Sequence, residues 1–354
     1  MELELLNSAD SVQHRKWIEI WDSWAGHEVY AHPNYANLYR KDSEDSIALY
    51  LKTKSGGILF PLIKRNISLE EWVNSKGTFY DVFSPYGYGG AFGWGDGFDF
   101  QTEFWMLYQQ WCKHNKIVST FVRLSLFSKQ VLTPLDGMDS PYGNIVRSLD
   151  LEADELLYDY THAVRKNIKR AIKSGLSVTV DRNGSLLDSF LSVYYSTMER
   201  VGASVGYFFP KEYFEKIIAL LPESFVFFHV LHEGMVISSE LVLVSDYNIY
   251  SFLGGTDPDY SDMRPNNFLK HEIIKWGREQ GKTNFVLGGG YRKDDGIFKY
   301  KQQMAPNGEL PFYTFKSIHC YDAYDQLVLM RKSWESSQGR EWQAADDFFP
   351  GYRS

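Results

Sequence analysis

This 354-residue sequence has few of the features that identify metalloenzymes or disulfide-rich secreted proteins. Its two cysteines, Cys112 and Cys320, fit neither a disulfide framework nor a zinc motif. The nine histidines show no HExxH spacing, and there is no Walker motif, GxSxG or Rossmann glycine fingerprint after an expected strand. We therefore expect no metal, flavin or nucleotide-hydrolysing centre.

Long apolar runs are also missing. One of the longer ones, residues 58–63, contains Pro61 and is far shorter than a membrane span. The first residues, MELELLNSADSVQ, are acidic and lack the apolar centre of a signal peptide. We expect a cytoplasmic protein with no membrane span.

Positive charge is in the minority, with 37 Lys+Arg against 45 Asp+Glu and a formal net charge of −8. This balance argues against a large nucleic-acid footprint, and we expect no DNA partner. The exception is an expected helix over residues 161–173, which contains no acid and five cations: Arg165, Lys166, Lys169, Arg170 and Lys173. Such a face is usually solvated, but it could also attract a phosphorylated substrate, with Arg165 the candidate contact.

Hydrophobic residues make up 44% of the chain and aromatic residues 16%, enough for well-filled cores. The length suggests two domains, which we place at residues 1–150 and 151–354. Strands are expected in runs, with hairpins and a meander over residues 225–254, rather than alternating with helices. The fold class predicted is α+β, with mixed, largely antiparallel sheets flanked by helices and a C-terminal helix.

The segment LGGGYRKDDGIFKYKQQMAP begins at Leu287 and holds three consecutive glycines. Glycines allow positive φ or a close approach to a ligand, so Gly289 is a candidate binding position. An acidic turn at Asp294 and Asp295 follows, and Lys301 comes shortly after on an expected helical turn. A flexible surface loop with a solvated lysine explains the same residues equally well.

A second candidate site lies where an expected strand ends at Gly255 and Asp257 and a helix begins after Arg264. Free backbone N–H groups at a helix start, next to Asn266 and Asn267, suit an anion. An ordinary capped helix is the alternative. Two further segments have the composition of a cleft wall, and their candidate substrate contacts are Thr197, Arg200, Tyr86 and Gly89.

These segments together resemble the FemAB-like branch of the GNAT acyltransferase superfamily, closest to sugar N-acyltransferase-like members. The matching pieces are SPYGYGG at residue 84, Arg165 with its helix, TMER at residue 197, LGGG at residue 287 and FKYK at residue 298. The chain departs from the pattern at Tyr300, where phenylalanine is common before the lysine, and at Met304, where an aromatic is usual.

The resemblance implies two tandem GNAT-like domains and transfer of an acyl group to an amine. Because the chain is acidic and shows no long helical-hairpin insertion, we expect acyl-CoA as donor and the amine of a nucleotide-linked amino sugar as acceptor, in bacterial surface-polysaccharide biosynthesis. The alternatives are an aminoacyl-tRNA-dependent transferase acting on a peptidoglycan precursor and a non-catalytic glycan- or nucleotide-binding protein.

Roles follow from this reading as hypotheses. Lys301 stabilises the oxyanion and Asp257 is the possible base. The donor phosphates are held by Gly255, Arg264, Asn266 and Asn267. The acceptor is contacted by Tyr86, Gly89, Arg165, Thr197, Arg200 and Gly289.

Overall fold

The computed structural model describes residues 1–74, 77–290 and 295–354, without the side chains of residues 140, 141 and 153. The chain divides into two units, each treated separately below. Unit 1 comprises residues 1–25, 30–141 and 312–354, and unit 2 comprises residues 26–29 and 142–311. None of the helices in the described part of the chain combines the length and apolarity that a bilayer crossing needs.

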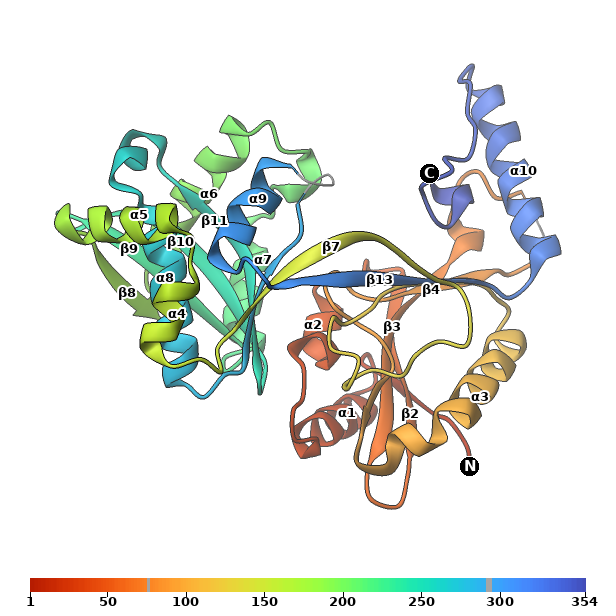
Figure 1. Cartoon of the computed structure of the whole chain (residues 1–354). Coiled ribbons are helices and arrows are strands. Elements are labelled where there is room, and N and C mark those ends of the chain that lie inside the picture. Colours follow the sequence, from red (N-terminus) through yellow and green to blue (C-terminus); the bar gives the residue numbers. More distant parts are fainter. Residues whose placement is uncertain (75–76, 291–294) are drawn as a thin grey trace. The chain divides into compact units, whose positions relative to one another are not determined.

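Unit 1 has a sheet in the strand order β1-β2-β3-β4-β6-β13, with β5 also pairing with β3 (Figure 1). Its core packs helix α3 against the sheet through aromatic contacts such as Phe60 with Phe104 and Tyr108. The elements are β1 (Glu4–Asn7), α1 (Ser11–Ser23), α2 (Pro33–Asn37), β2 (Glu44–Lys52), β3 (Gly57–Asn66), β4 (Tyr80–Phe83), β5 (Phe92–Trp94), α3 (Gln101–His114), β6 (Ile117–Arg123), β13 (Glu309–Ile318) and α10 (Tyr321–Ser337).

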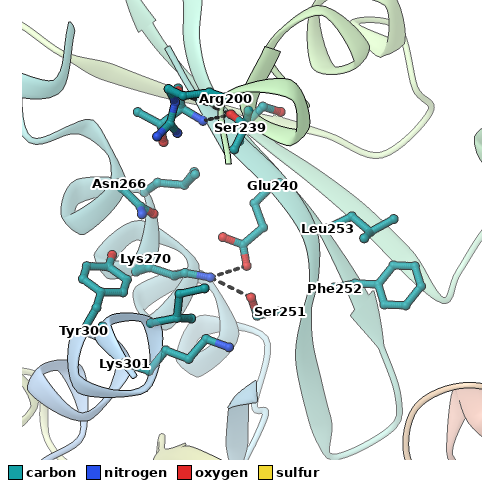
Figure 2. A pocket seen from close by; sticks show the side chains of 17 residues that line it. Arg200, Ser239, Glu240, Ser251, Phe252, Leu253, Asn266, Lys270, Tyr300 and Lys301 are labelled. Carbon is teal, nitrogen blue, oxygen red and sulfur yellow. Dashed lines mark hydrogen bonds and ion pairs between the residues drawn. The ribbon is translucent and has the colours of Figure 1, made fainter. Parts of the chain in front are cut away.

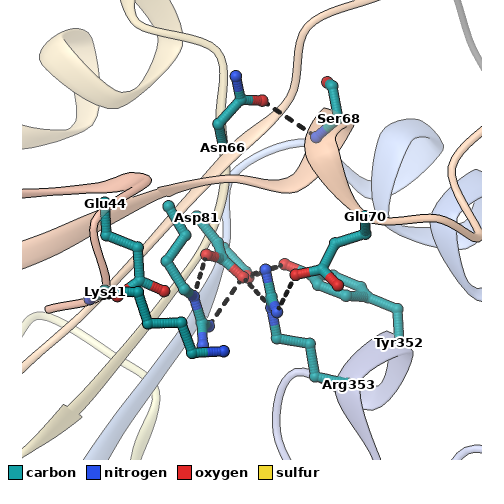
Figure 3. Close-up of polar contacts among 10 residues, drawn as sticks. Lys41, Glu44, Asn66, Ser68, Glu70, Asp81, Tyr352 and Arg353 are labelled. Atoms are coloured by element: carbon teal, nitrogen blue, oxygen red, sulfur yellow. Dashed lines mark hydrogen bonds and ion pairs between the residues drawn. The ribbon is translucent and has the colours of Figure 1, made fainter.

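A buried ion cluster ties the end of the chain to the sheet of unit 1 (Figure 3). Asp81 on β4 is 1% exposed and accepts two hydrogen bonds from Arg65, at 2.7 and 3.0 Å. Arg353 donates to Asp81 at 2.9 Å and to Glu70 at 2.9 Å, and Tyr352 donates to Asp81 at 3.1 Å. A buried carboxylate needs such partners, so these contacts fix the C-terminal residues in place.

Unit 2 has a sheet in the order β7-β12-β11-β10-β9-β8, in which β8 to β11 are antiparallel and β12 is parallel to β11. Helices α5 and α8 pack together, α8 covers β9 and β10, and α6 packs against β10 and β11 (Figure 1). The elements are β7 (Met138–Ser148), α4 (Ala153–Asp159), α5 (His162–Lys173), β8 (Ser177–Asp181), α6 (Leu187–Arg200), α7 (Lys211–Leu220), β9 (Phe225–His232), β10 (Met235–Val244), β11 (Asn248–Thr256), the 3-10 segment η5 (Pro258–Met263), α8 (Pro265–Glu279), β12 (Asn284–Gly288) and α9 (Gly296–Met304).

The core of unit 2 follows from the amphipathic pattern of its helices. Val164, Ile168 and Ala171 recur at helical spacing on α5 and are all buried. They join Ile273 of α8 and Val226 of β9 in one apolar cluster. Helix α5 ends before Gly175, which has φ +74° in the left-handed region that favours glycine, as the sequence predicts.

The two units repeat one topology. In unit 1, β4 is followed by α3 and the parallel strand β6, which pairs antiparallel with β13. In unit 2, β11 is followed by α8 and the parallel strand β12, which pairs antiparallel with β7. The predicted α+β class, with two domains of similar topology and mixed, largely antiparallel sheets flanked by helices, is confirmed.

The last strand of each sheet comes from the other half of the chain. Strand β7 leads the chain into unit 2 and pairs with β12, whereas β13 leads it back into unit 1 and pairs with β6. The predicted second domain includes residues 312–354, whereas the structure groups these residues with unit 1. The reason is the β13–β6 pairing, which a contiguous division near residue 150 cannot represent.

Candidate functional site

The site of unit 2 begins where two parallel strands separate. Strands β11 and β12 pair only from Asn248 to Tyr250, opposite Asn284 to Val286. Beyond Tyr250, within the described residues, no strand pairs with this edge of β11. Backbone N–H and C=O groups along residues 251–255 on this side are therefore available to a ligand, whereas the Thr256 N–H already donates to Thr197 Oγ1.

A cavity of about 410 Å³ lies along this open edge. Its walls come from α6, β10, β11, α8 and α9, and all of them belong to unit 2. Its charged lining residues are three cations, Arg200, Lys270 and Lys301, and one acid, Glu240. In a protein with a net charge of −8, this excess of cations favours an anionic ligand or a reaction that develops negative charge.

A buried ion pair forms the floor of the cavity. Lys270 on α8 donates to Glu240 Oε1 on β10 at 2.6 Å and to Ser251 Oγ on β11 at 2.7 Å. Glu240 and Lys270 are 4% and 6% exposed. Figure 2 shows both side chains directed into the same space as Lys301. Within the described residues, Glu240 makes no side-chain hydrogen bond besides the one from Lys270.

Lys301 comes from α9, whose first turn is capped by Asp295 accepting from the Phe298 N–H at 2.8 Å. Its Nζ donates to the Gly289 carbonyl at 2.6 Å. Burial lowers the pKa of Lys301 from 10.5 to about 8; nearby Lys270 lowers it further, whereas Glu240 and Asp295 oppose the shift. At neutral pH the side chain is a cation with limited solvation beside the open strand edge.

Tyr300 adds a polar atom that the protein itself does not satisfy. Its hydroxyl is buried, lines the cavity and has no hydrogen-bond partner among the described residues. Burial and the nearby Glu240 raise its pKa, so the hydroxyl remains protonated and can donate. A buried polar group without a partner costs about 1–3 kcal/mol, which a ligand accepting from it would offset.

Helix α6 closes another side of the cavity. Thr197 Oγ1 accepts from the Thr256 N–H at 3.0 Å and donates to the Val193 carbonyl at 2.9 Å, which joins the end of β11 to the helix. Gly255 lies against this contact: a Cβ there would be 2.5 Å from both Thr197 Oγ1 and the Val193 carbonyl oxygen. Arg200, one turn further on, is exposed and lines the cavity.

Five residues predicted from the sequence thus line one cavity: Thr197, Arg200, Gly255, Asn266 and Lys301. Gly289 is adjacent through its hydrogen bond with Lys301. Their chemical roles remain predictions.

Three other predicted residues lie near the cavity without lining it. Asp257 caps η5 by accepting from the Asp259 N–H at 3.0 Å. Arg264 has φ +61° immediately before Pro265, which begins α8, and makes no side-chain cap hydrogen bond. Asn267 is 7% exposed, and its amide accepts from Asn167 at 3.0 Å. These contacts give Asp257 and Asn267 structural roles.

The remaining predicted contacts lie elsewhere. Arg165 on α5 donates to the carbonyls of Tyr158 and Tyr160. Tyr86 and Gly89 belong to unit 1. Tyr86 is 46% exposed, with its carbonyl accepting from Tyr35 at 2.8 Å, and the Gly89 N–H donates to the Arg123 carbonyl at 2.7 Å. Asp294 lies outside the described residues.

Sequence reasoning missed the ion pair of Glu240 and Lys270. Glu240 is the single charged residue of β10 and lies between buried strand residues, and Lys270 follows the buried Phe268 and Leu269 on α8. A lone charge at an inward position is the signal that would have identified them, because buried charges need a partner. Within the described residues, no group of three His, Cys, Asp or Glu side chains could hold a metal ion.

Comparison with known proteins agrees with this geometry. Residues 160–302, all in unit 2, match the family described as acetyltransferase (GNAT) domain. Two curated relatives from Staphylococcus epidermidis strains, each named lipid II:glycine glycyltransferase, are 33% identical over 57 residues. That match covers 16% of this chain and 14% of the length of each relative.

The crystal structure of FemX is similar over almost the whole chain, with a TM-score of 0.67 and 14% identity, covering 93% of this chain and all of that one. The C-terminal domain of a putative lysylphosphatidylglycerol synthetase from Agrobacterium fabrum gives a TM-score of 0.51 at 14% identity, covering 90% of this chain and 96% of that one. At this level of identity the two structures establish the fold.

These findings correct one expectation. The main prediction, transfer from acyl-CoA to a nucleotide-linked amino sugar in surface-polysaccharide biosynthesis, is wrong. The curated relatives are named for glycyl transfer to lipid II. The predicted resemblance to the FemAB-like branch and the assignment as an acyltransferase are confirmed.

Proposed function

We propose that this chain, which resembles the FemAB-like branch of the GNAT acyltransferase superfamily, transfers an aminoacyl group from aminoacyl-tRNA to an amine of a peptidoglycan precursor. The observation that carries the proposal is the match to the lipid II:glycine glycyltransferases. A cavity with three cations and one acid at an open strand edge supports it, since an aminoacyl ester on a nucleic acid is an anionic donor.

The reaction needs the ester carbonyl and the acceptor amine to be held in contact, which alone can provide much of the rate enhancement. The open edge of β11 offers backbone N–H and C=O groups that can hold the aminoacyl group in an extended form. Lys301 then lies close enough to this edge to stabilise the negative charge that develops on the carbonyl oxygen.

Glu240 replaces Asp257 as the proposed proton acceptor. It is the only carboxylate among the described residues that line the cavity, and Lys270, which also donates to Ser251, holds it in place. The neutral amine forms a bond to the carbonyl carbon and gives one proton to Glu240. The carbon–oxygen bond to the tRNA ribose then breaks, and the leaving oxygen receives that proton.

The proposal is tested by supplying the protein with radiolabelled aminoacyl-tRNA, starting with glycyl-tRNA, and with lipid II or its soluble nucleotide-linked precursor. We expect label to appear in the precursor only when protein, charged tRNA and acceptor are all present. The test variant is Lys301→Met, which keeps a side chain of similar volume and removes its charge. It should reduce transfer by about 100-fold or more. Turnover with acyl-CoA and none with any aminoacyl-tRNA would contradict the proposal.

A further inference from the structure

We propose that the outer face of α5 binds the sugar–phosphate backbone of the tRNA donor, an inference that rests on the proposed function. The surface is defined by four side chains, Lys166, Lys169, Arg170 and Lys173, and is called the α5 stripe below. It is separate from the cavity, which α5 does not line.

The α5 stripe is continuous. Its members lie at positions i, i+3, i+4 and i+7 of one helix, so they share one face over about 10 Å. Val164, Ile168 and Ala171 occupy the opposite face and are buried in the core of unit 2. All four cations are exposed. At a rise of about 3.4 Å per nucleotide in a strand, a stripe of this length faces on the order of three phosphates.

The protein leaves most of this charge unbalanced. Among the described residues, Lys166, Lys169 and Lys173 make neither an ion pair nor a side-chain hydrogen bond. Arg170 approaches Asp262 at 3.9 Å, with both side chains largely exposed. Like charges three and four residues apart destabilise a helix, and α5 contains no acid to relieve them. A polyanion bound along the stripe would remove that repulsion.

The α5 stripe lies beside the elements that build the cavity. Helix α5 packs against α8, α9 and η5, and α8 and α9 provide Asn266, Lys270 and Lys301 to the cavity lining. A hydrogen bond from Asn167 to Asn267, 3.0 Å long, joins α5 to the first turn of α8. A donor whose reactive end occupies the cavity therefore has the stripe within reach of its adjoining backbone.

A nucleic acid fits this surface better than an anionic membrane does. A helix that binds a bilayer inserts an apolar face below the headgroups. The apolar face of α5 is already used in the core, and outside it the helix exposes the four cations and a single large apolar side chain, Ile172. What remains is an electrostatic surface without base-reading geometry, which is the property expected of a phosphate-backbone contact.

The experiment measures binding of deacylated tRNA to the full-length protein by fluorescence anisotropy between 50 and 300 mM KCl. The test variant carries Lys166→Gln, Lys169→Gln and Lys173→Gln. The matched control carries Lys113→Gln, Lys129→Gln and Lys216→Gln, which remove the same charge from other exposed positions. Arg170 is left unchanged because of its contact with Asp262.

We expect the control to bind like the wild type and the test variant to bind about 10- to 100-fold more weakly at 100 mM KCl. The slope of its log affinity against log salt concentration should be smaller in magnitude by about 2 to 3, because each lost phosphate contact reduces the slope by about 0.9. Equal loss in both variants, unchanged binding in the test variant, or tighter binding to phosphatidylglycerol vesicles than to tRNA would overturn the proposal.

A second readout separates this surface from the proposed reaction. The aminoacyl ester of a CCA trinucleotide is too short to extend from the cavity to the α5 stripe. The test variant should therefore use this short donor as well as the wild type does, but should lose activity with full-length aminoacyl-tRNA. If the wild type and both variants turn over neither donor but tRNA binding still depends on the α5 stripe, the proposed reaction is wrong and the proposed binding surface is supported. If turnover of both donors is unaffected by the triple substitution, the surface fails and the reaction stands.

Discussion

The pKa of Lys301 leads to a quantitative prediction about stability. Because burial lowers this pKa from 10.5 to about 8, the folded state disfavours the charged amine by about 3 kcal/mol relative to the unfolded chain. The penalty is complete below pH 8 and is relieved as the pH rises from about 8 to 10.5, where the unfolded state still binds the proton that the folded state has released.

Lys301→Met removes the penalty together with the hydrogen bond to the Gly289 carbonyl, which contributes about 1 kcal/mol. At pH 7 we expect the variant to be more stable than the wild type by about 2 kcal/mol, and at pH 10.5 less stable by about 1 kcal/mol. Urea denaturation of both proteins across this range measures the difference, and subtraction cancels other groups that titrate there.

A difference in unfolding free energy that stays constant with pH would refute the reasoning. It would mean that Lys301 titrates with the same pKa in the folded and unfolded states. The same loss of charge should lower transfer activity of the wild type as the pH rises through about 8, whereas Lys301→Arg, which keeps its charge, should show no such decline.

The remaining predictions concern three other positions. Glu240→Gln should lower kcat by about 100-fold or more, because the proton acceptor is lost. It should also cost about 3 kcal/mol of stability, because Lys270 remains buried without its partner. An unchanged kcat would exclude Glu240 as the base. Asp81→Asn should destabilise unit 1 by about 3–5 kcal/mol in urea denaturation, and a loss under 1 kcal/mol would show that its arginine contacts are weak. Gly255→Ala should cost about 1–3 kcal/mol and distort the cavity, whereas Gly296→Ala, also in the lining but with no atom within 4 Å of the new Cβ, should be neutral; equal effects would contradict the steric argument.

Much of the local structure could be predicted from the sequence. Periodicity and end signals placed α5 within one residue of its observed bounds and the start of α8 directly after Arg264, and the meander expected over residues 225–254 corresponds to β9, β10 and β11. These elements are governed by local patterns: α8, for example, begins at Pro265 and is followed by Gly281, which has positive φ.

The exchange of terminal strands could not be predicted in this way. Pairing of β13 with β6 joins residues almost 200 positions apart, and nothing in the local pattern of β13 indicates which sheet it enters. The sequence of a single strand predicts which side chains lie on each of its two faces, but it does not predict which strands pair with it.

The candidate site was predicted in part for the same reason. Lys301, Thr197 and Gly255 were identified because glycine turns and a nearby lysine form local signals. Glu240 and Lys270 are 30 positions apart and meet only when α8 packs on β10. Asn267 was predicted to help bind an anion at the start of α8. In the structure it is buried and accepts a hydrogen bond from Asn167 instead.

The central claim is that the open edge of β11 in unit 2 holds the aminoacyl group beside Lys301. The measurement that tests it most directly is a crystal structure with an aminoacyl-adenosine in which an amide replaces the reactive ester. The account predicts hydrogen bonds from the ligand to the backbone of residues 251–255 and its carbonyl oxygen within reach of Lys301 Nζ. A ligand bound away from this cavity, with Lys301 still held only by Gly289, would contradict it.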